Sequence, residues 1–152
     1  MLVIEDDEND AILLRQAFDT LTGEICMEFV RDGQQALAYL KGTGQFADRT
    51  LYPVPNLIVL DLKMPGPSGF DVLRWLRAQP AYLRVPVIVL SGSTWPGDIE
   101  EAYRLGANSY LVKPARRSEL EEVVQLASTF WFQMNLGASQ TTRQPLPTEK
   151  RP

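Results

Sequence analysis

Short apolar runs recur along the chain, at residues 2–4, 25–30, 57–60, 85–90 and 110–112. Residues 57–60 and 87–90 contain no polar side chain at all. Continuous apolar runs of this length are typical of strands that are covered on both faces. The pattern therefore predicts five strands in a buried sheet.

Between these runs, apolar residues recur at the i, i+3, i+4, i+7 spacing of an amphipathic helix. The predicted stripes are Leu14, Ala17, Phe18 and Leu21; Ala36, Leu37 and Leu40; Gly69, Val72, Leu73 and Leu76; Ile99, Ala102 and Tyr103; and Leu120, Val123, Val124, Ala127, Phe130, Trp131 and Met134. Five repeats of strand then helix predict an α/β fold, a doubly wound parallel sheet with right-handed crossovers. In such sheets, reactive groups gather beyond the carboxyl ends of the strands.

Two segments lie outside this alternation. Residues 42–56 are rich in Gly and Pro, and we expect a long exposed connection there. Residues 137–152 are polar and lack periodicity, so we expect a disordered tail. The chain is thus predicted to form one domain over residues 1–136, followed by the tail.

Composition narrows the function further. The 152 residues carry a formal net charge of −4, which argues against nucleic acid as a partner. No apolar run approaches the roughly 18 residues of a membrane span, and the N-terminus lacks a secretory profile. The single cysteine, Cys26, cannot form an internal disulfide and is expected to be a buried strand thiol, so we expect a cytoplasmic protein. The absence of histidine excludes histidine metal sites, Ser-His triads and a phosphohistidine role for this chain.

Polar residues follow four of the apolar runs. Glu5 and Asp6 follow the first, Asp61 the third, Ser91 the fourth and Lys113 the fifth. If the sheet is parallel, all of these residues lie at one edge.

Each of these residues also has an ordinary structural explanation. Acids near a helix start favour the positive end of its dipole, and an Asp after a strand can cap a turn. A loop Ser can bond to backbone, and a Lys can be a surface amine. Each explanation taken alone is at least as good as a functional one. All four together, at four strand ends, are much harder to explain in this way.

Phosphoryl transfer is the chemistry that unites this set. Neighbouring carboxylates repel one another and require a cation, and Mg²⁺ prefers such oxygen ligands. An aspartate can be the nucleophile and form an aspartyl-phosphate, whose oxygens are stabilised by ammonium and hydroxyl donors. The sequence therefore predicts Asp61 as nucleophile, Lys113 and Ser91 as donors, and Asp6 with Glu5 as metal ligands.

The sequence resembles the response-regulator receiver family over residues 1 to about 130. The resemblance is carried by Glu5-Asp6, by Asp61-Leu-Lys-Met-Pro65 with Gly69, by Leu90-Ser91-Gly92, by residues 106–110 (GANSY) and by Leu111-Val112-Lys113-Pro114. It implies the flavodoxin-like (βα)5 fold with strand order 2-1-3-4-5.

The resemblance also implies roles for individual residues. Asp61 would be the phospho-acceptor and, with Asp6, a direct Mg²⁺ ligand. Glu5 would bind the ion through water, and Lys63 would bind it through its backbone carbonyl. Lys113 would pair with the phosphoryl oxygens.

A second set of implied roles concerns the conformational switch. Ser91 would move toward the phosphoryl group, and Tyr110 would follow it as the aromatic switch. The Lys113–Pro114 peptide would be cis, although X-Pro bonds are cis only about 5–6% of the time in folded proteins.

By the same resemblance, the chain is a single-domain response regulator of a two-component phosphorelay. Its partners would be a sensor histidine kinase and a downstream protein that the sequence does not identify. It would be a signalling protein that catalyses only its own phosphorylation and dephosphorylation. The long 42–56 loop and the aromatic ending at 129–132 resemble regulators of phytochrome-type kinases.

Three rival functions fit the sequence less well. A pseudo-receiver, which binds without phosphorylation, would be expected to lack one of the residues named above. A phosphatase of the haloacid-dehalogenase type needs a second acid two residues after the nucleophile, where this chain has Lys63. A flavodoxin-like cofactor domain would not place acids where it must bind a phosphate.

Three consecutive aromatic residues, Phe130, Trp131 and Phe132, end the last helical stripe. One helix face cannot bury all three against its own sheet. The hypothesis is a homodimer or partner interface, and the alternative is a C-terminal end that wraps back on the domain.

Overall fold

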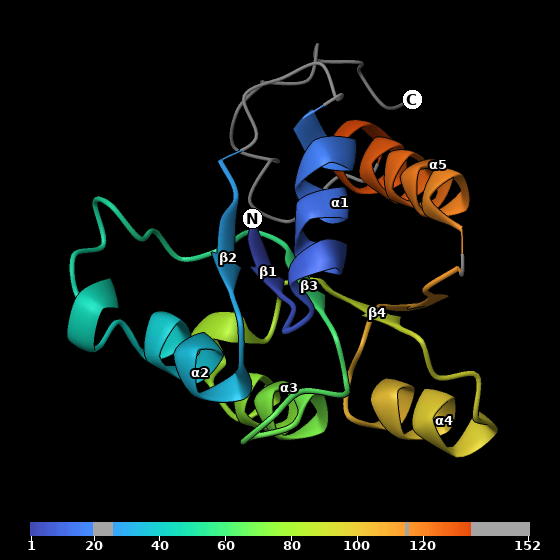
Figure 1. Ribbon diagram of the computed structural model, residues 1–152. Coiled ribbons are helices and arrows are strands. Elements are labelled where there is room, and N and C mark those ends of the chain that lie inside the picture. Colours follow the sequence, from blue (N-terminus) through green and yellow to red (C-terminus); the bar gives the residue numbers. More distant parts are fainter. Residues whose placement is uncertain (20–25, 115, 135–152) are drawn as a thin grey trace, which may run out of the picture.

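Five parallel strands form the centre of the computed structural model, which describes residues 1–19, 26–114 and 116–134 (Figure 1). They are β1 (Leu2–Ile4), β2 (Glu28–Val30), β3 (Ile58–Leu60), β4 (Val87–Ser91) and β5 (Ser109–Val112). The strand order is β2-β1-β3-β4-β5, and every neighbouring pair is parallel. The predicted fold class and strand order are confirmed.

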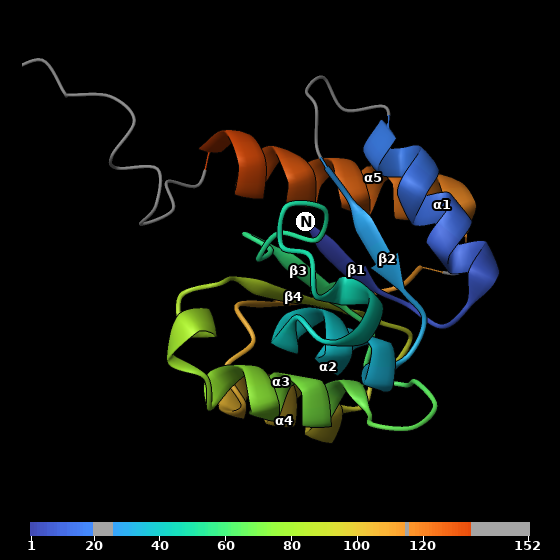
Figure 2. The same cartoon turned by 90° about the vertical axis from the view of Figure 1, so that its left-hand side faces the viewer.

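Helices cover both faces of this sheet (Figures 1 and 2). They are α1 (Glu8–Asp19), α2 (Gly33–Lys41), α3 (Gly69–Arg77), α4 (Pro96–Arg104) and α5 (Arg117–Ser128), and α5 continues as a π-helical segment, Thr129–Met134. The helices α1 and α5 pack together on one face, and α2, α3 and α4 lie on the other.

The central strand β1 shows why its residues are all apolar. Leu2 and Ile4 point into the core under α2 and α3, whereas Val3 points into the core that Leu14 and Val124 form under α1 and α5. Side chains of a strand alternate between the faces, so a strand covered on both faces must be apolar at every position.

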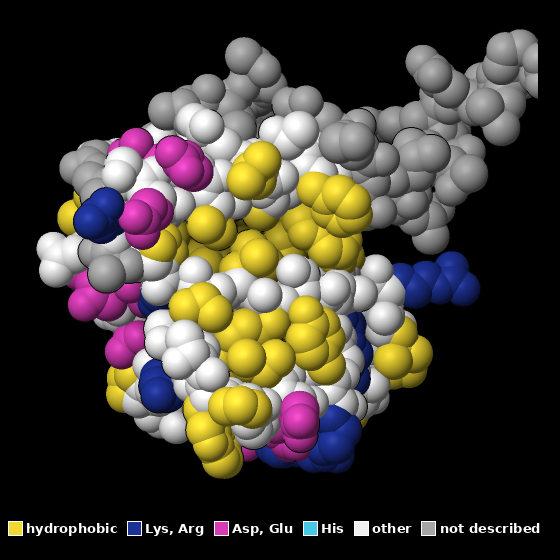
Figure 3. Space-filling model, turned by 90° about the vertical axis from the view of Figure 1, so that its right-hand side faces the viewer, with side chains coloured by type: hydrophobic (Ala, Val, Ile, Leu, Met, Phe, Trp, Pro, Cys, Tyr) yellow, Lys and Arg dark blue, Asp and Glu magenta, His cyan; other side chains and the backbone are white. Residues whose placement is uncertain are grey.

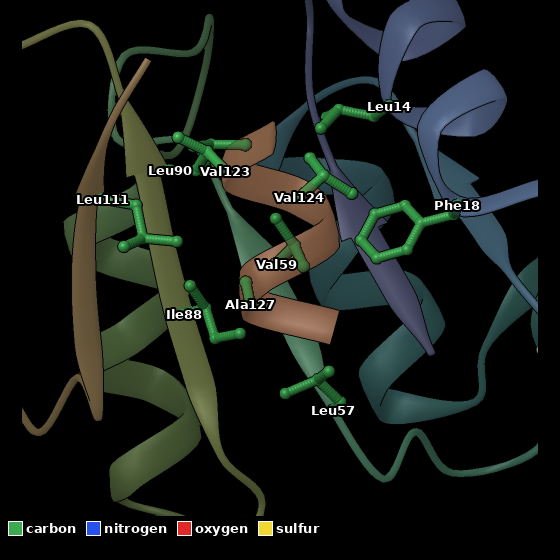
Figure 4. Close-up of a pocket in the computed structure, with 10 residues that line it drawn as sticks. All are labelled: Leu14, Phe18, Leu57, Val59, Ile88, Leu90, Leu111, Val123, Val124 and Ala127. Atoms are coloured by element: carbon green, nitrogen blue, oxygen red, sulfur yellow. The ribbon is translucent and has the colours of Figure 1, made fainter. Parts of the chain in front are cut away.

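The core under α1 and α5 encloses a small cavity of about 20 Å³ (Figure 4). It is lined by Leu14, Phe18, Leu57, Val59, Ile88, Leu90, Leu111, Val123, Val124 and Ala127. This volume would admit one water molecule, but a buried water needs polar partners and this lining is apolar. We therefore regard the cavity as a dry packing defect.

The 42–56 connection is mostly exposed, as predicted, and also contains local structure that the sequence pattern did not indicate. It contains a 3₁₀ turn, Gly44–Phe46, and Phe46 is buried. The rings of Tyr39, Phe46 and Tyr52 contact one another with centroids 5.1–6.1 Å apart. Arg49 donates hydrogen bonds to the carbonyls of Leu40 and Tyr52. An aromatic cluster therefore anchors the loop to α2.

The expectation of a buried thiol is wrong. Cys26 is exposed and lies just before β2, and its carbonyl accepts a hydrogen bond of 2.7 Å from the N-terminal amine. The strand starts at Glu28, later than the apolar run suggested, so the thiol lies outside the covered part of the sheet.

The predicted tail at 137–152 lies outside the described residues. Among the helices that the structure does describe, none combines the length and the apolar character needed to cross a membrane.

Candidate functional site at the carboxyl ends of the strands

Backbone pairing brings the predicted site residues to one edge of the sheet. Asp61 follows β3 and donates its backbone N–H to the carbonyl of Ile4, the residue before Glu5. Lys113 follows β5 and donates its backbone N–H to Ser91 at the end of β4, at 2.9 Å. The parallel register thus brings the acids, the hydroxyl of Ser91 and the amine of Lys113 to one edge of the sheet, as the sequence predicted.

The carboxylate of Asp61 is held in place by the backbone of its own turn. Its Oδ1 accepts hydrogen bonds from the amides of Leu62, at 2.5 Å, and Lys63, at 3.2 Å. The first residue of α3, Gly69, packs against this turn. A Cβ at Gly69 would lie 2.2 Å from the carbonyl oxygen of Asp61, so no larger residue fits. The glycine lets the helix start directly beneath the acceptor.

Lys113 is the central cation of the edge. Its Nζ lies 2.7 Å from Glu5 Oε2, 2.8 Å from Asp61 Oδ2 and 2.9 Å from Asp10 Oδ2, and its side chain is only 13% exposed. Burial alone would lower the pKa of Lys113. Hydrogen bonds and opposite charges from Asp61 and Glu5 outweigh burial and raise the pKa above its ordinary value. Lys113 is therefore permanently charged at neutral pH.

Glu5 is the most deeply buried acid of the site, with 2% of its surface exposed. Burial raises its pKa to about 7, and the neighbouring charge of Asp61 adds to this, while Lys113 opposes it. Because the charged form of Glu5 is disfavoured by burial, a further cation bound at this edge would stabilise it.

Three carboxylates converge where the sequence predicted a metal. Glu5, Asp6 and Asp61 can each offer an oxygen, and these atoms lie within 4.8 Å of one another; Asp6 is exposed, whereas the other two are buried. An all-oxygen donor set of this kind suits a hard divalent cation. Lys63 lies in the same turn, as its amide contact with Asp61 shows. That its carbonyl is a ligand stays a prediction.

Ser91 is fully buried, and its Oγ has no hydrogen-bond partner within the described part of the chain. Buried hydroxyls are normally hydrogen-bonded, because an unpaired one costs free energy. An unpaired donor at this edge is what a site for an oxygen-rich ligand requires.

Tyr110 is connected to α4 through a serine. Its hydroxyl donates to the carbonyl of Ser93 at 2.9 Å, and the Ser93 hydroxyl donates to Asp98 in the first turn of α4. Burial raises the pKa of Tyr110. The ring is thus held near the acceptor edge, and its role as a switch stays a prediction.

The cis prediction is wrong in this structure, because no described peptide bond is cis and Lys113–Pro114 is therefore trans. An X-Pro bond prefers trans by about 0.5–1 kcal/mol. The backbone bond of Lys113 to Ser91 and its three ion pairs are all formed with the trans peptide.

Sequence reasoning missed two carboxylates, Asp10 and Asp98. The first belongs to the acidic run after β1, for which charge at a helix start was the ordinary explanation, and nothing in that run distinguishes Asp10 from its neighbours. The second follows Ser93 by five residues across a Trp-Pro-Gly turn, and no local pattern indicates their contact.

At the end of α5, Phe130 is 51% exposed and Trp131 is half-buried. Their rings meet edge to face with centroids 5.1 Å apart. The side chain of Phe132 lies outside those that the structure describes.

The comparisons with known proteins agree with this site. The family model for the response regulator receiver domain matches residues 1–125. The chain belongs to this family: it is a receiver domain of the two-component response regulators.

Within the receiver family, the chain is similar to the response regulator Rcp1. The response regulator Rcp1 of Synechocystis sp. is 34% identical over 133 residues, covering 88% of each chain. The structure of its Mn²⁺-bound form matches with a TM-score of 0.83 at 33% identity, over 90% of this chain and 96% of Rcp1.

Two further solved structures are similar. The phosphorylated cyanobacterial phytochrome response regulator RcpA matches with a TM-score of 0.86 at 34% identity, over 90% of this chain and 96% of RcpA. RPA3017, a response regulator in red light signaling of R. palustris, matches with a TM-score of 0.82 at 38% identity, over 90% and 95% of the two chains.

Proposed function

We propose that this protein accepts a phosphoryl group on Asp61, from the phosphohistidine of a sensor histidine kinase, in a Mg²⁺-dependent reaction. The observation that carries the proposal is the arrangement around one carboxylate. Asp61 is buried and contacts Lys113 at 2.8 Å, two further acids converge on it, and an unpaired Ser91 hydroxyl lies at the same edge.

The transfer needs little from the protein beyond positioning and charge. A carboxylate oxygen of Asp61 forms a bond to phosphorus as the phosphorus–nitrogen bond of the donor breaks, and the electron pair returns to the imidazole nitrogen. The ammonium of Lys113 and the hydroxyl of Ser91 stabilise the phosphoryl oxygens. Later, water attacks phosphorus, the bond to Asp61 breaks, and inorganic phosphate leaves.

The residues present fit the metal that the family implies. The carboxylates of Glu5, Asp6 and Asp61 supply oxygen donors only, as Mg²⁺ prefers, and the carbonyl of Lys63 would be a further ligand. When bound, the ion would neutralise charge on the transferring group. The relative Rcp1 has been solved in a Mn²⁺-bound form, which supports the proposal that this chain too binds a divalent ion.

Phosphorylation would change the charge of the edge and so act as a signal. The added group carries about −1.5 to −2 charges and three acceptor oxygens, which attract Ser91 and Lys113. Tyr110, Ser93 and Asp98 form the chain of contacts from the acceptor edge to α4. The switched surface would bind a downstream protein, and the chain would act as a cytoplasmic signalling protein, catalysing only its own phosphorylation and dephosphorylation.

The cognate kinase is proposed to be of the phytochrome type. This rests on two similar proteins, because RcpA is a cyanobacterial phytochrome response regulator and RPA3017 is a response regulator in red light signaling.

A homodimer remains part of the proposal. Hydrophobic side chains gather on the side of the molecule that carries α4 and α5 (Figure 3). The exposed apolar residues in or next to α4, β5 and α5 include Trp95, Tyr103, Val112, Leu126 and Phe130. Sedimentation that shows only monomer at high concentration would remove this part of the proposal.

Intact mass after incubation with Mg²⁺ and acetyl phosphate or phosphoramidate tests the proposal. We expect a single phosphoryl adduct that requires Mg²⁺ and disappears in Asp61→Asn. The alternative, a pseudo-receiver that binds partners without phosphorylation, predicts no adduct with any donor even when the reaction is quenched early.

A further inference from the structure

A groove lies beside the amino ends of β1 and β2, at the opposite end of the sheet from Asp61. Its volume is about 430 Å³, which is in the size range of ligand-binding pockets. The 42–56 connection forms one wall, and the segment that leads into β2 forms the other. The lining includes Cys26, Met27, Glu28, Tyr39, Leu51 and Val54. The proposed phosphoryl chemistry makes no use of this groove.

The lining of the groove is mainly apolar and partly exposed. Leu51 is 70% exposed and Val54 is 53% exposed. The hydroxyl of Tyr39 donates to the carbonyl of Pro53 at 2.9 Å, which fixes this wall against α2. Among the lining residues that the structure describes, Glu28 carries the one charged side chain. The groove therefore offers apolar surface beside a single negative charge.

The C-terminal tail, residues 137–152, has a complementary sequence. It carries three basic side chains and one acidic side chain, a charge of +2, so the preceding 136 residues carry −6 of the total of −4. Leu146 is the one large aliphatic residue of the tail and stands between Pro145 and Pro147. The prolines restrict this segment to an extended backbone, so it loses little entropy when it binds.

The chain leaves α5 on the side of the molecule where the groove lies. The helix runs back toward the amino ends of the strands (Figure 2). Ala127 of α5 lines the same cavity as Leu57, and Asn56, the residue before Leu57, lines the groove. Leu146 follows Met134 by twelve residues, which can span up to about 40 Å. The tail is therefore long enough to reach the groove.

We propose that residues 145–147 of the tail bind in this groove of the same chain, with their leucine against Leu51 and Val54. The basic residues of the tail favour a site whose one charge is that of Glu28. Attachment to the same chain gives the tail an effective concentration of about millimolar, so a weak contact is enough. Because Cys26 is exposed and lines the groove, the bound tail covers this thiol.

The thiol of Cys26 provides the first test, because it is the one cysteine of the chain. Its rate of modification by N-ethylmaleimide, followed by intact mass, reports whether the groove is covered. Leu146→Ser should raise this rate about three- to tenfold, because the loss of one buried leucine is enough to empty most of the groove. Leu146→Met should stay near the wild-type rate. Equal rates for wild type and Leu146→Ser overturn the proposal.

The groove side has its own variant and a matched control. Leu51→Ser should also raise the rate, but much less in a chain that already carries Leu146→Ser, because binding of the tail is then already lost. Leu83 is an exposed leucine that lies before β4, outside the lining of the groove. Leu83→Ser should leave the rate unchanged. Additive effects of the first two variants, or an equal effect of Leu83→Ser, contradict the proposal.

A disulfide tests the position of the tail directly. Thr148→Cys adds a second thiol beside the bound segment, and mild oxidation should join it to Cys26 within one chain. The reaction should be about three- to tenfold slower when the same chain also carries Leu146→Ser. The two chains close loops of equal length, so the entropy of loop closure is the same. Equal rates overturn the proposal, and a disulfide-linked dimer as the main product shows that the tail binds a second copy instead.

These measurements are independent of the proposed function. None of them uses Mg²⁺ or a phosphoryl donor, and none of the variants changes a residue of the acceptor edge. A chain that forms no phosphoryl adduct can therefore still show the covered thiol, and the reverse also holds.

Discussion

Two cations in this fold have every N–H donor in use, and their partners differ in kind. At the carboxyl ends of the strands, Lys113 is matched by three carboxylates. Near the amino ends of β4 and β5, Arg77 uses all five guanidinium N–H groups on neutral oxygens. These are the carbonyls of Gly106, accepting twice, Tyr82 and Val85, and the side-chain oxygen of Asn108, at 2.8–3.0 Å.

We interpret Arg77 as a structural cation and Lys113 as the cation of the proposed phosphoryl-acceptor site. Burial lowers the pKa of Arg77. All five of its hydrogen bonds go to neutral oxygens, so none of its partners is a charged group that another ion could replace. The acids around Lys113 exceed its charge, so the edge can take up another cation, and Lys113 can turn to another anion. At the amino end of the sheet, Arg77 is held by hydrogen bonds to neutral oxygens. At the carboxyl end, the excess of carboxylates over cations favours binding of a further cation.

The largest stability effect is expected from the structural cation. Arg77→Met removes five hydrogen bonds and leaves several carbonyls without partners, so the free energy of unfolding should fall by about 3 kcal/mol. Urea unfolding checks this, and Mg²⁺ should not restore the loss. Arg104→Met, which removes an exposed pair with Glu101, should change the stability far less. Equal losses in the two variants would contradict the assignment of Arg77 as structural.

The functional cation should behave differently. Lys113→Met leaves Glu5, Asp10 and Asp61 without their shared cation, and in chelator the free energy of unfolding should fall by about 2 kcal/mol. Because the remaining acids can hold a divalent ion, millimolar MgCl₂ should recover most of this loss. Urea unfolding with and without MgCl₂ measures both quantities. A loss that Mg²⁺ does not reduce would refute the distinction between the two ends.

Asp61→Asn should change stability in the opposite direction. It removes one of several like charges, while the amide oxygen can still accept the bonds from Leu62 and Lys63. In chelator we expect a gain of about 1 kcal/mol in the free energy of unfolding, and a smaller further gain from Mg²⁺ than in wild type. A less stable variant in chelator would show that repulsion does not dominate this edge.

At the amino end of the sheet, we expect a smaller effect, a dependence of the free energy of unfolding on pH through Tyr82. Burial raises the pKa of Tyr82, whose hydroxyl donates to Leu40 at 2.5 Å, although Arg49 opposes the rise. Its folded pKa therefore lies above its unfolded value, and this stabilising contribution is complete below about pH 10 and is lost as the pH rises further. Above pH 10 the free energy of unfolding should fall more steeply in wild type than in Tyr82→Phe. Parallel pH profiles would contradict this.

The sequence predicts the carboxyl end better than the amino end. Each site residue directly follows an apolar run, so locating the strands located Asp61, Ser91 and Lys113. The hydrogen bonds of Arg77 join α3 to segments 5–31 residues away, and nothing local in the sequence marks them.

The errors have the same physical origin. Cys26 has apolar neighbours but lies before the start of β2, and the aromatic cluster of the 42–56 loop depends on packing across α2. The contact of Asp10 with Lys113 depends on where α1 lies against the sheet, which the acidic run itself does not specify. The trans peptide before Pro114 was mispredicted from the family resemblance alone.

The measurement that tests the central claim most directly is chemical location of the phosphoryl group. After reaction with acetyl phosphate and Mg²⁺, borohydride reduces an aspartyl-phosphate to homoserine, which peptide mass spectrometry assigns to one position. We predict homoserine at position 61 only, dependent on both donor and Mg²⁺ and strongly reduced in Lys113→Met. Homoserine at Asp6 or Asp10 instead, or at no position with early quenching, would contradict the assignment of this edge as the phosphoryl-acceptor site.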